Sequence, residues 1–200
     1  GALSYRAGRD AVDNLSGQLL VETVNRIAQA VDRHVAGSAA VLEAAFPQGV
    51  PAPADVATDI DALRTRFWLA TSMHRDPNNY AYYGDRQGRF FGLWRHSASD
   101  AELRLRLRGE GPRRIHRFSG IRGELGPALD EERIFDPRER PWFRAAERVA
   151  TPTWTSIYID FRTAELVATR TRRVNGAAGT FEGVVATDLS LRKVNDFLRR

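Results

Sequence analysis

Cysteine is absent from this 200-residue chain, which excludes a disulfide framework, a thiol nucleophile and a cysteine-ligated metal site. The absence does not decide the cellular compartment. Lysine is almost absent as well, because Lys193 is the only one. No apolar run approaches the roughly 20 residues that a membrane-spanning helix needs, so we expect no membrane span within this sequence.

Catalytic and metal-binding motifs are missing too. The sequence contains no HExxH, GxSxG, Walker or GxGxxG element, and no nucleophile lies at a catalytic spacing from a base. The four histidines are His34, His74, His96 and His116, and no two of them have the spacing of metal ligands. We therefore expect a protein that is not an enzyme and that uses neither a metal nor a cofactor.

The remaining composition is that of an ordinary globular domain, with 42% hydrophobic and 28% charged residues. A chain of this length forms one domain, or one domain with a helical extension. The net charge of +5 and the pI near 10.2 arise almost entirely from arginine. A basic nucleic-acid-binding domain is therefore an alternative function. The arginines are dispersed rather than clustered, which favours a genomic bias toward arginine codons instead.

Residues 2–46 carry apolar side chains at helical spacing and predict one long helix. The positions that set the spacing are Leu15, Leu19, Val24, Ile27, Val31, Val35 and Leu42. A helix of about 40 residues is about 60 Å long, more than this domain needs to cover, so we expect it to form a homodimer or to continue a membrane helix. Three prolines and a glycine end it at residues 47–53, which divides the chain into a helical segment, 1–53, and a compact module, 54–200.

The module begins with a second helix, capped by Asp55 or Thr58 and ending near His74. An aromatic hairpin follows at residues 79–94. Residues 103–107 alternate leucine with arginine, as in a half-buried strand whose basic face is in solvent. Further candidate strands lie at 113–118, 153–160, 166–174 and 181–187. Residues 119–134 are expected to be a loop, and a short helix is expected at the end of the chain. We predict an α+β fold, with the long helix packed on an antiparallel sheet of five or six strands.

The segment FDPRERPWF, residues 135–143, is the most informative stretch of the chain. A residue before proline avoids the helical region, so Asp136 and Arg140 should be extended, and the second proline suits the first position of a helix. The N–H groups of Trp142 and Phe143 at that helix start, with the arginine and indole side chains, would form a corner for a carboxylate. The alternative is that Arg140 pairs with a neighbouring acid and Trp142 fills the core.

Other polar residues are candidates for the same site. Arg138 lies two positions before Arg140 and would share its side of an extended segment. Tyr158 and Asp160 are two apart on a predicted strand, where a phenol and a carboxylate would receive an ammonium group. The alternative for Asp160 is an exposed turn at the strand end. Asp188 or Ser190 could also cap the terminal helix, and taken alone Asp188 is better interpreted as such a cap.

Three blocks of sequence together resemble the ligand-binding module of Cache sensor domains, especially of the double Cache type. They are FDPRERPWF at 135–143, WTSIYID at 154–160 and GVVATDLSL at 183–191, in the family's order and at about its spacing. Cache domains are PAS-like extracytoplasmic domains of bacterial transmembrane receptors. The resemblance implies a PAS-like sheet, a periplasmic or extracellular position in an inner-membrane protein, and no nucleic-acid partner.

The resemblance also implies roles for particular residues. In the family, the arginine and tryptophan that match Arg140 and Trp142 bind the carboxylate of an amino-acid ligand. Carboxylates at the positions of Asp160 and Asp188 contact the ligand's amine. The implied function is therefore a sensor for an amino acid or another small carboxylate.

Tyrosine often stands in the family where this chain has Phe135 and Phe143, so two hydroxyls that would bond to the ligand are missing. A small organic acid without an amine is therefore a further candidate ligand. A double Cache domain has a second, membrane-proximal module after a segment like residues 188–191, so we expect residues 54–200 to be the membrane-distal module of a larger sensor. The parent receptor would drive a cytoplasmic cyclase, histidine kinase or chemotaxis output, which nothing in this sequence identifies.

Overall fold

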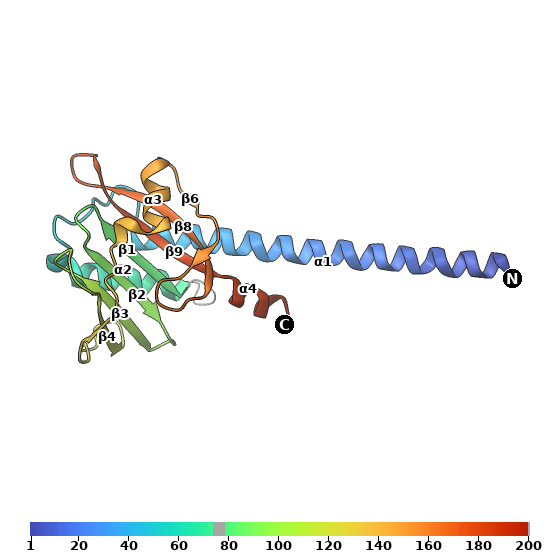
Figure 1. Cartoon of the computed structure of the whole chain (residues 1–200), viewed down its shortest axis with the longest axis horizontal. Helices are drawn as coiled ribbons and strands as arrows, with labels where there is room; N and C mark the ends of the chain where they lie inside the picture. The colour runs from blue at the N-terminus through green and yellow to red at the C-terminus, as the bar shows by residue number, and fades with distance from the viewer. Residues whose placement is uncertain (74–78, 200) are drawn as a thin grey trace.

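The computed structural model describes residues 1–73 and 79–199 of the chain. Its first element is helix α1 (Ala2–Ala45), whose 44 residues extend far from the rest of the molecule (Figure 1). Every side chain of α1 before Ala30 is exposed, so the helix reaches the domain only with its C-terminal part. The predicted long helix is confirmed.

An antiparallel sheet of nine strands forms the centre of the described structure. The strand order is β5-β4-β3-β2-β1-β9-β8-β6, with β7 paired to β8, so the last strand lies beside the first in the middle of the sheet. The sequence predicts five or six strands, and the structure has more because it includes three strands of two residues, too short for alternation to reveal. The strands are β1 (Tyr80–Asp85), β2 (Phe90–Arg95), β3 (Asp100–Arg106), β4 (Arg114–Ser119), β5 (Leu129–Asp130), β6 (Thr153–Trp154), β7 (Tyr158–Ile159), β8 (Leu166–Asn175) and β9 (Phe181–Ser190).

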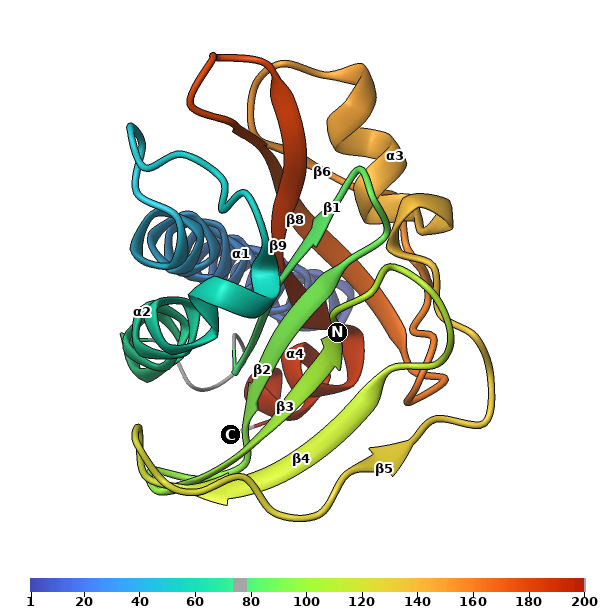
Figure 2. The same cartoon turned by 90° about the vertical axis from the view of Figure 1, so that its left-hand side faces the viewer.

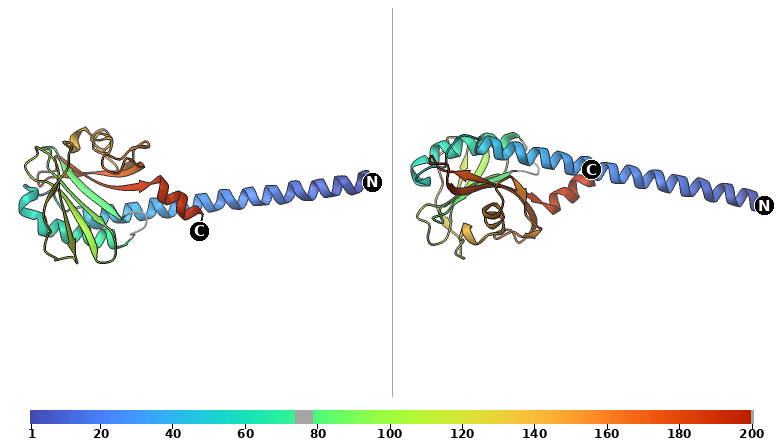
Figure 3. Two further views of the ribbon diagram at one scale, coloured as in Figure 1. Left: turned by 60° about the horizontal axis from the view of Figure 1, so that its bottom comes forward. Right: turned by 90° about the horizontal axis from the view of Figure 1, so that it is seen from above.

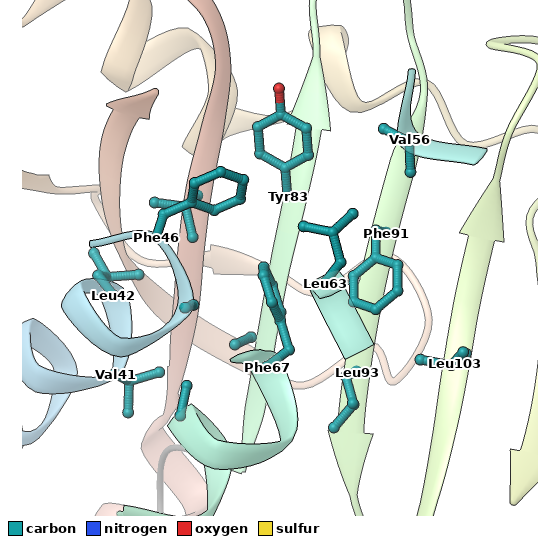
Figure 4. Close-up of a cluster of buried hydrophobic side chains, with 14 of the residues drawn as sticks. Val41, Leu42, Phe46, Val56, Leu63, Phe67, Tyr83, Phe91, Leu93 and Leu103 are labelled. Atoms are coloured by element: carbon teal, nitrogen blue, oxygen red, sulfur yellow. The ribbon is translucent and has the colours of Figure 1, made fainter. Parts of the chain in front are cut away.

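Helices α1 and α2 (Ile60–Met73) cover one face of the sheet (Figure 2). Asp55 caps the 3-10 turn Val56–Asp59 before α2, because its carboxylate accepts a hydrogen bond from Ala57 N over 3.0 Å. The predicted end of this helix, at His74, lies outside the described residues. The main core fills the space between helices and sheet (Figure 4), with Val41, Leu42, Phe46, Val56, Leu63, Phe67, Tyr83, Phe91, Leu93 and Leu103 among its buried residues.

The opposite face of the sheet is covered by the segment that contains the 3-10 turn η2 (Pro137–Glu139) and helix α3 (Pro141–Arg148) (Figure 2). A second buried cluster, rich in aromatic rings, lies beneath this segment. It comprises Tyr80, Tyr82, Phe90, Phe135, Trp142, Phe143, Ala146, Val184 and Ala186. The sheet is therefore buried on both faces at its centre, and the predicted α+β fold is confirmed.

This second layer corrects two sequence predictions. The alternation in β3 predicts a basic face in solvent, but Arg104 and Arg106 are only 1% and 5% exposed. The predicted extended strip before α3 is interrupted by η2. Asp136 and Arg140 are extended as predicted, yet the turn between them breaks the alternation of side chains.

Helix α4 (Leu191–Leu198) continues directly from β9. It contacts α1 near the point where the long helix leaves the sheet (Figure 3). The C-terminal element and the middle of α1 therefore lie side by side, next to the central strands.

Candidate functional site

The floor of the candidate site is built by β1 and its neighbours. Tyr80 and Tyr82 are two apart on the strand and both belong to the aromatic cluster beneath α3. Tyr82 pairs with Ala186 of β9, which places Asp188 beside them. The Tyr82 hydroxyl donates to Asp188 Oδ1 over 2.5 Å, and the Thr169 hydroxyl of β8 donates to the same oxygen over 2.8 Å. Three strands thus converge on one carboxylate.

The Asp188 carboxyl has an altered proton affinity. Burial, and then the nearby Asp160 carboxylate, raise the pKa of Asp188 to about 7, and its hydrogen bonds offset only part of this rise. Burial also raises the pKa of Tyr82 well above its usual value. The prediction that Asp188 caps the terminal helix is wrong, because its side chain points into this network. Ser190 Oγ accepts a hydrogen bond from Lys193 N of α4 instead, over 3.4 Å.

Trp142 and Arg140 form the roof. The Trp142 ring is buried and meets the Tyr82 ring edge to face, with centroids 4.8 Å apart. Its carbonyl accepts a hydrogen bond from Thr171 Oγ1 over 2.8 Å, which fixes α3 on β8. The half-buried Arg140 donates through Nη2 to Ile159 O over 3.2 Å. Within the described residues Arg140 forms no ion pair, so its charge is not neutralised by a neighbouring acid.

The helix start offers fewer donors than the sequence predicts. Phe143 N donates to Arg140 O over 3.1 Å and is therefore not free to bind an anion. The Phe143 ring contacts Phe181 and Trp142 in the cluster below the roof. Phe135 is also buried there.

Arg138 lies away from the other candidates. Its guanidinium pairs with Asp136 Oδ2 over 2.8 Å and is largely exposed. The 3-10 turn η2 contains Arg138 and turns the chain at this point. The pair therefore stands at the outer surface of the α3 segment.

Tyr158 and Asp160 approach the network from β7. The Tyr158 hydroxyl is hydrogen-bonded to Thr169 Oγ1 over 2.6 Å, which joins it to the tyrosine–carboxylate network. The Asp160 carboxylate accepts hydrogen bonds from Arg162 N and Thr163 N, over 3.0 Å and 2.8 Å. Asp160 therefore forms the turn that the alternative interpretation predicts, at a position that also borders the site.

Two small cavities lie between floor and roof. The aromatic cavity, about 10 Å³, is lined by Tyr80, Tyr82, Phe90, Arg113, Phe135, Arg140, Trp142, Tyr158, Asp160 and Phe161. The polar cavity, about 50 Å³, is lined by Asn79, Tyr80, Trp94, Arg104, Asp160, Thr163, Glu165, Val167, Asp188, Ser190 and Lys193. The two adjoin, because they share two lining residues, Tyr80 and Asp160. The aromatic cavity has room for about one water molecule and the polar cavity for a few, so an amino acid or a dicarboxylate enters only if the roof moves away from the floor.

The two cavities thus bring together six of the eight predicted residues with others that sequence reasoning missed. Of the residues predicted to bind the ligand, only Phe143 and Arg138 line neither cavity. The Phe143 ring still packs against the Trp142 ring. The missed residues include Tyr80 and Tyr82, whose alternation along β1 was a usable signal. Arg104 had no such signal, since the alternation of leucine and arginine in its sequence is that of a half-exposed strand.

Larger surface hollows lie elsewhere. One of about 650 Å³ adjoins the β8–β9 hairpin, and one of about 600 Å³ lies beside β3 and β4. Neither is lined by any predicted site residue. In residues 1–73 and 79–199, no group of three histidine, aspartate or glutamate side chains is placed to hold a metal ion. No helix within those same ranges is long and apolar enough to cross a membrane.

No protein-family model matches the chain. Solved structures do resemble it. The ligand-binding domain of the Campylobacter jejuni chemoreceptor Tlp3 in complex with L-norvaline matches with a TM-score of 0.58 and 12% identity, over 90% of this chain and 60% of that one. The sensory domain of the same receptor with isoleucine bound matches with a TM-score of 0.57 and 13% identity, over 90% and 61%.

A receptor from another organism gives a similar result. The ligand-binding domain of the amino-acid chemoreceptor PctC of Pseudomonas aeruginosa, in complex with GABA, matches with a TM-score of 0.52 and 18% identity, over 92% of this chain and 64% of that one. The chain thus spans less than two thirds of the length of these domains. At such identities the likeness shows the fold alone. The PAS-like fold that the Cache resemblance implies is confirmed: this chain folds as the ligand-binding domains of bacterial chemoreceptors do.

Proposed function

We propose that this chain is an extracytoplasmic sensor domain of a bacterial transmembrane receptor, and that it binds a small carboxylate-bearing ligand such as an amino acid or an organic acid. The observation that carries the proposal is the composition of the two adjoining cavities. Arg140, a cation without an ion-pair partner in the described chain, lines the aromatic cavity together with Asp160. Asp160 and Asp188 line the adjoining polar cavity. Such a set of groups recognises a small polar molecule by its charges.

Each residue has a role in this proposal. Arg140 binds the ligand's carboxylate, because a guanidinium combines charge with a planar pair of donors. Trp142 and Phe135 exclude water around that ion pair. Tyr158, Asp160 and Asp188 face the other end of the ligand, where an amine would bind.

The ligands of the matching domains support this assignment. L-norvaline, isoleucine and GABA are bound by Tlp3 and PctC. All three molecules carry a carboxylate and an amine. The absence of hydroxyls at Phe135 and Phe143 favours a ligand that is held mainly through its acidic group.

The arginine excess also has an explanation within the fold. Many arginines donate to backbone carbonyls, as Arg95 does to Ala98 O over 2.7 Å and Arg173 to Ala146 O over 2.7 Å. Side chains that are used in this way do not form a continuous basic surface for a nucleic acid. This use of arginine argues against the nucleic-acid-binding alternative.

In the proposed receptor the domain is anchored to a membrane. Residues 54–200 form its ligand-binding module, and α1 forms the contact in a homodimer.

The decisive variant is Arg140→Ala. We expect it to weaken binding of a carboxylate ligand by about 2–4 kcal/mol, since truncating one partner of a buried charge pair leaves the other unpaired. A thermal-shift screen of amino acids and organic acids identifies the ligand, and calorimetry then compares wild type with the variant.

The matched control is Arg138→Ala, which removes an arginine of the same segment that is paired with Asp136 at the surface. We expect it to leave the affinity unchanged. Equal binding by wild type and Arg140→Ala would show that the ligand site lies elsewhere. Failure of wild type to bind any carboxylate would refute the proposed function itself.

A further inference from the structure

One buried cation of the polar cavity has no role in the proposed site. Arg104 of β3 is only 1% exposed. Its Nε donates to Glu102 Oε2 over 3.0 Å, whereas Nη2 is buried and has no hydrogen-bond partner in the part of the chain that the structure describes. A buried charged donor is costly to leave unpaired, so its position marks a place for an acceptor.

The surroundings hold this guanidinium in place and in its charged form. Gly92 stands opposite Arg104 on β2 and brings no side chain of its own. The guanidinium carbon lies 4.6 Å from the ring centre of Tyr80 and 4.4 Å from that of Trp94. Burial alone would lower the pKa of Arg104, but the neighbouring Tyr80 and Glu102 outweigh it and raise the pKa. Arg104 is therefore a fixed cation at the wall of the polar cavity.

The acids that line the same cavity are engaged elsewhere. Asp160 accepts from the N–H groups of its own turn. Glu165 pairs with Arg192 over 3.1 Å, and Asp188 accepts from two hydroxyl groups. The one ion pair of Arg104 within the described residues is with Glu102, on its own strand. Apart from Glu102, the only side chain in the described part of the chain that interacts with this guanidinium as an acceptor is the Tyr80 hydroxyl, so the buried Nη2 is free to bind an acidic group that enters the cavity.

We propose that Arg104 binds a second acidic group of the ligand, so that the domain senses a small dicarboxylate, with or without an amine. This inference rests on the proposed function and narrows it. One carboxylate lies at Arg140 in the aromatic cavity, and the other lies at Arg104 in the polar cavity. Lys193, whose Nζ is bonded to Asn79 Oδ1 over 2.7 Å, adds a second positive charge beside Arg104.

Calorimetry with matched pairs of probes tests the proposal. The dicarboxylates malonate, succinate, glutarate and adipate are compared with the monocarboxylates butyrate and valerate, and L-glutamate is compared with L-norvaline. We expect wild type to prefer the best dicarboxylate over its monocarboxylate counterpart by about thirtyfold or more. Arg104→Gln should remove this preference while it leaves the monocarboxylate affinity within about threefold. Arg140→Ala should weaken both classes.

The matched control is Arg106→Gln, on the same strand. Arg106 is also buried, but it donates to Gly88 O and Gly111 O and does not line the cavity. We expect that variant to keep the dicarboxylate preference.

Equal affinity of wild type for both members of each pair would overturn the inference, even if Arg104→Gln did not fold. A preference that survives in Arg104→Gln would overturn it too and would leave Arg104 a purely structural residue. In both cases loss of monocarboxylate binding in Arg140→Ala would still support the proposed function. If wild type binds none of these probes, the function and the inference both fail.

Discussion

Asp188 has the most unusual setting of any single residue in the site. Its pKa of about 7 lies above that of a free aspartate because burial, and then the Asp160 carboxylate, disfavour the charged form. In the unfolded chain the same carboxyl titrates near pH ~4. Between these pH values the folded protein binds the proton more tightly than the unfolded chain. The contribution of Asp188 to stability is therefore fully present below about pH 4 and is lost as the pH rises through about 7.

We expect Asp188→Asn to remove this pH dependence. The asparagine oxygen still accepts from Tyr82 and Thr169, but the side chain carries no titrating proton. The melting temperature of the variant relative to wild type should therefore rise between about pH 4 and about pH 8. Calorimetric melting across this range checks it. A difference between the two proteins that does not change with pH would mean that Asp188 is ionised throughout.

Some site residues could be predicted from the sequence because a local pattern positions them. The proline that starts α3 places Arg140 and Trp142 at the start of the helix, and both residues line the aromatic cavity. Arg104 could not be found in this way. Alternation shows that Arg104 and Leu103 lie on opposite faces of β3, but it does not show what covers each face. The bond from Tyr82 to Asp188 joins residues 106 positions apart and depends on the pairing of β1 with β9.

At the scale of elements, the site depends on how closely β1 passes under the α3 segment. Gly84 makes this approach possible. A Cβ atom at Gly84 would lie 2.8 Å from Pro137 Cβ and 2.8 Å from Trp142 Cη2, inside the contact distance of carbon atoms. The absence of a side chain on β1 therefore sets the height of the tryptophan over the cavity.

We expect Gly84→Ala to destabilise the fold by about 1–3 kcal/mol, because the added methyl group overpacks this contact. It should also weaken ligand binding, since Trp142 must shift. Chemical denaturation and ligand calorimetry measure the two effects. Gly17→Ala is the control, because a Cβ there meets nothing within 4 Å on the exposed part of α1. A Gly84→Ala protein as stable as wild type would show that the α3 segment moves freely on the sheet.

The sequence predicted most elements but not their irregularities. It predicts one continuous strand over residues 153–160, whereas the structure has β6 and β7 with a break between them. Thr155 explains the break. Its N–H donates to Thr169 O over 2.9 Å, while its hydroxyl, rather than its carbonyl, accepts from Thr169 N over 2.9 Å. A side chain that replaces the backbone in a ladder is not visible in a hydrophobic pattern.

At the scale of the whole molecule, α1 joins a compact domain to a long exposed rod (Figure 1). The C-terminal end of α1 belongs to the main core through residues such as Val41 and Leu42. The remainder exposes a series of large apolar side chains, including Leu15, Leu19, Leu20, Val24, Ile27 and Val31. A single apolar side chain at a surface is ordinary, but a series along one helix favours a partner helix. We therefore expect α1 to pair with a second copy.

The final prediction separates the two parts of α1. A variant that lacks residues 2–29 removes only exposed side chains, because Ala30 is the first buried residue. We expect it to keep the melting temperature and the ligand affinity of the full chain and to lose self-association. Calorimetry and sedimentation velocity at high protein concentration measure these properties side by side. If the full chain sediments as a strict monomer, the predicted pairing of α1 is wrong. If the shortened chain instead melts at a lower temperature, the exposed part of α1 stabilises the domain and the expectation that it serves only in pairing is wrong.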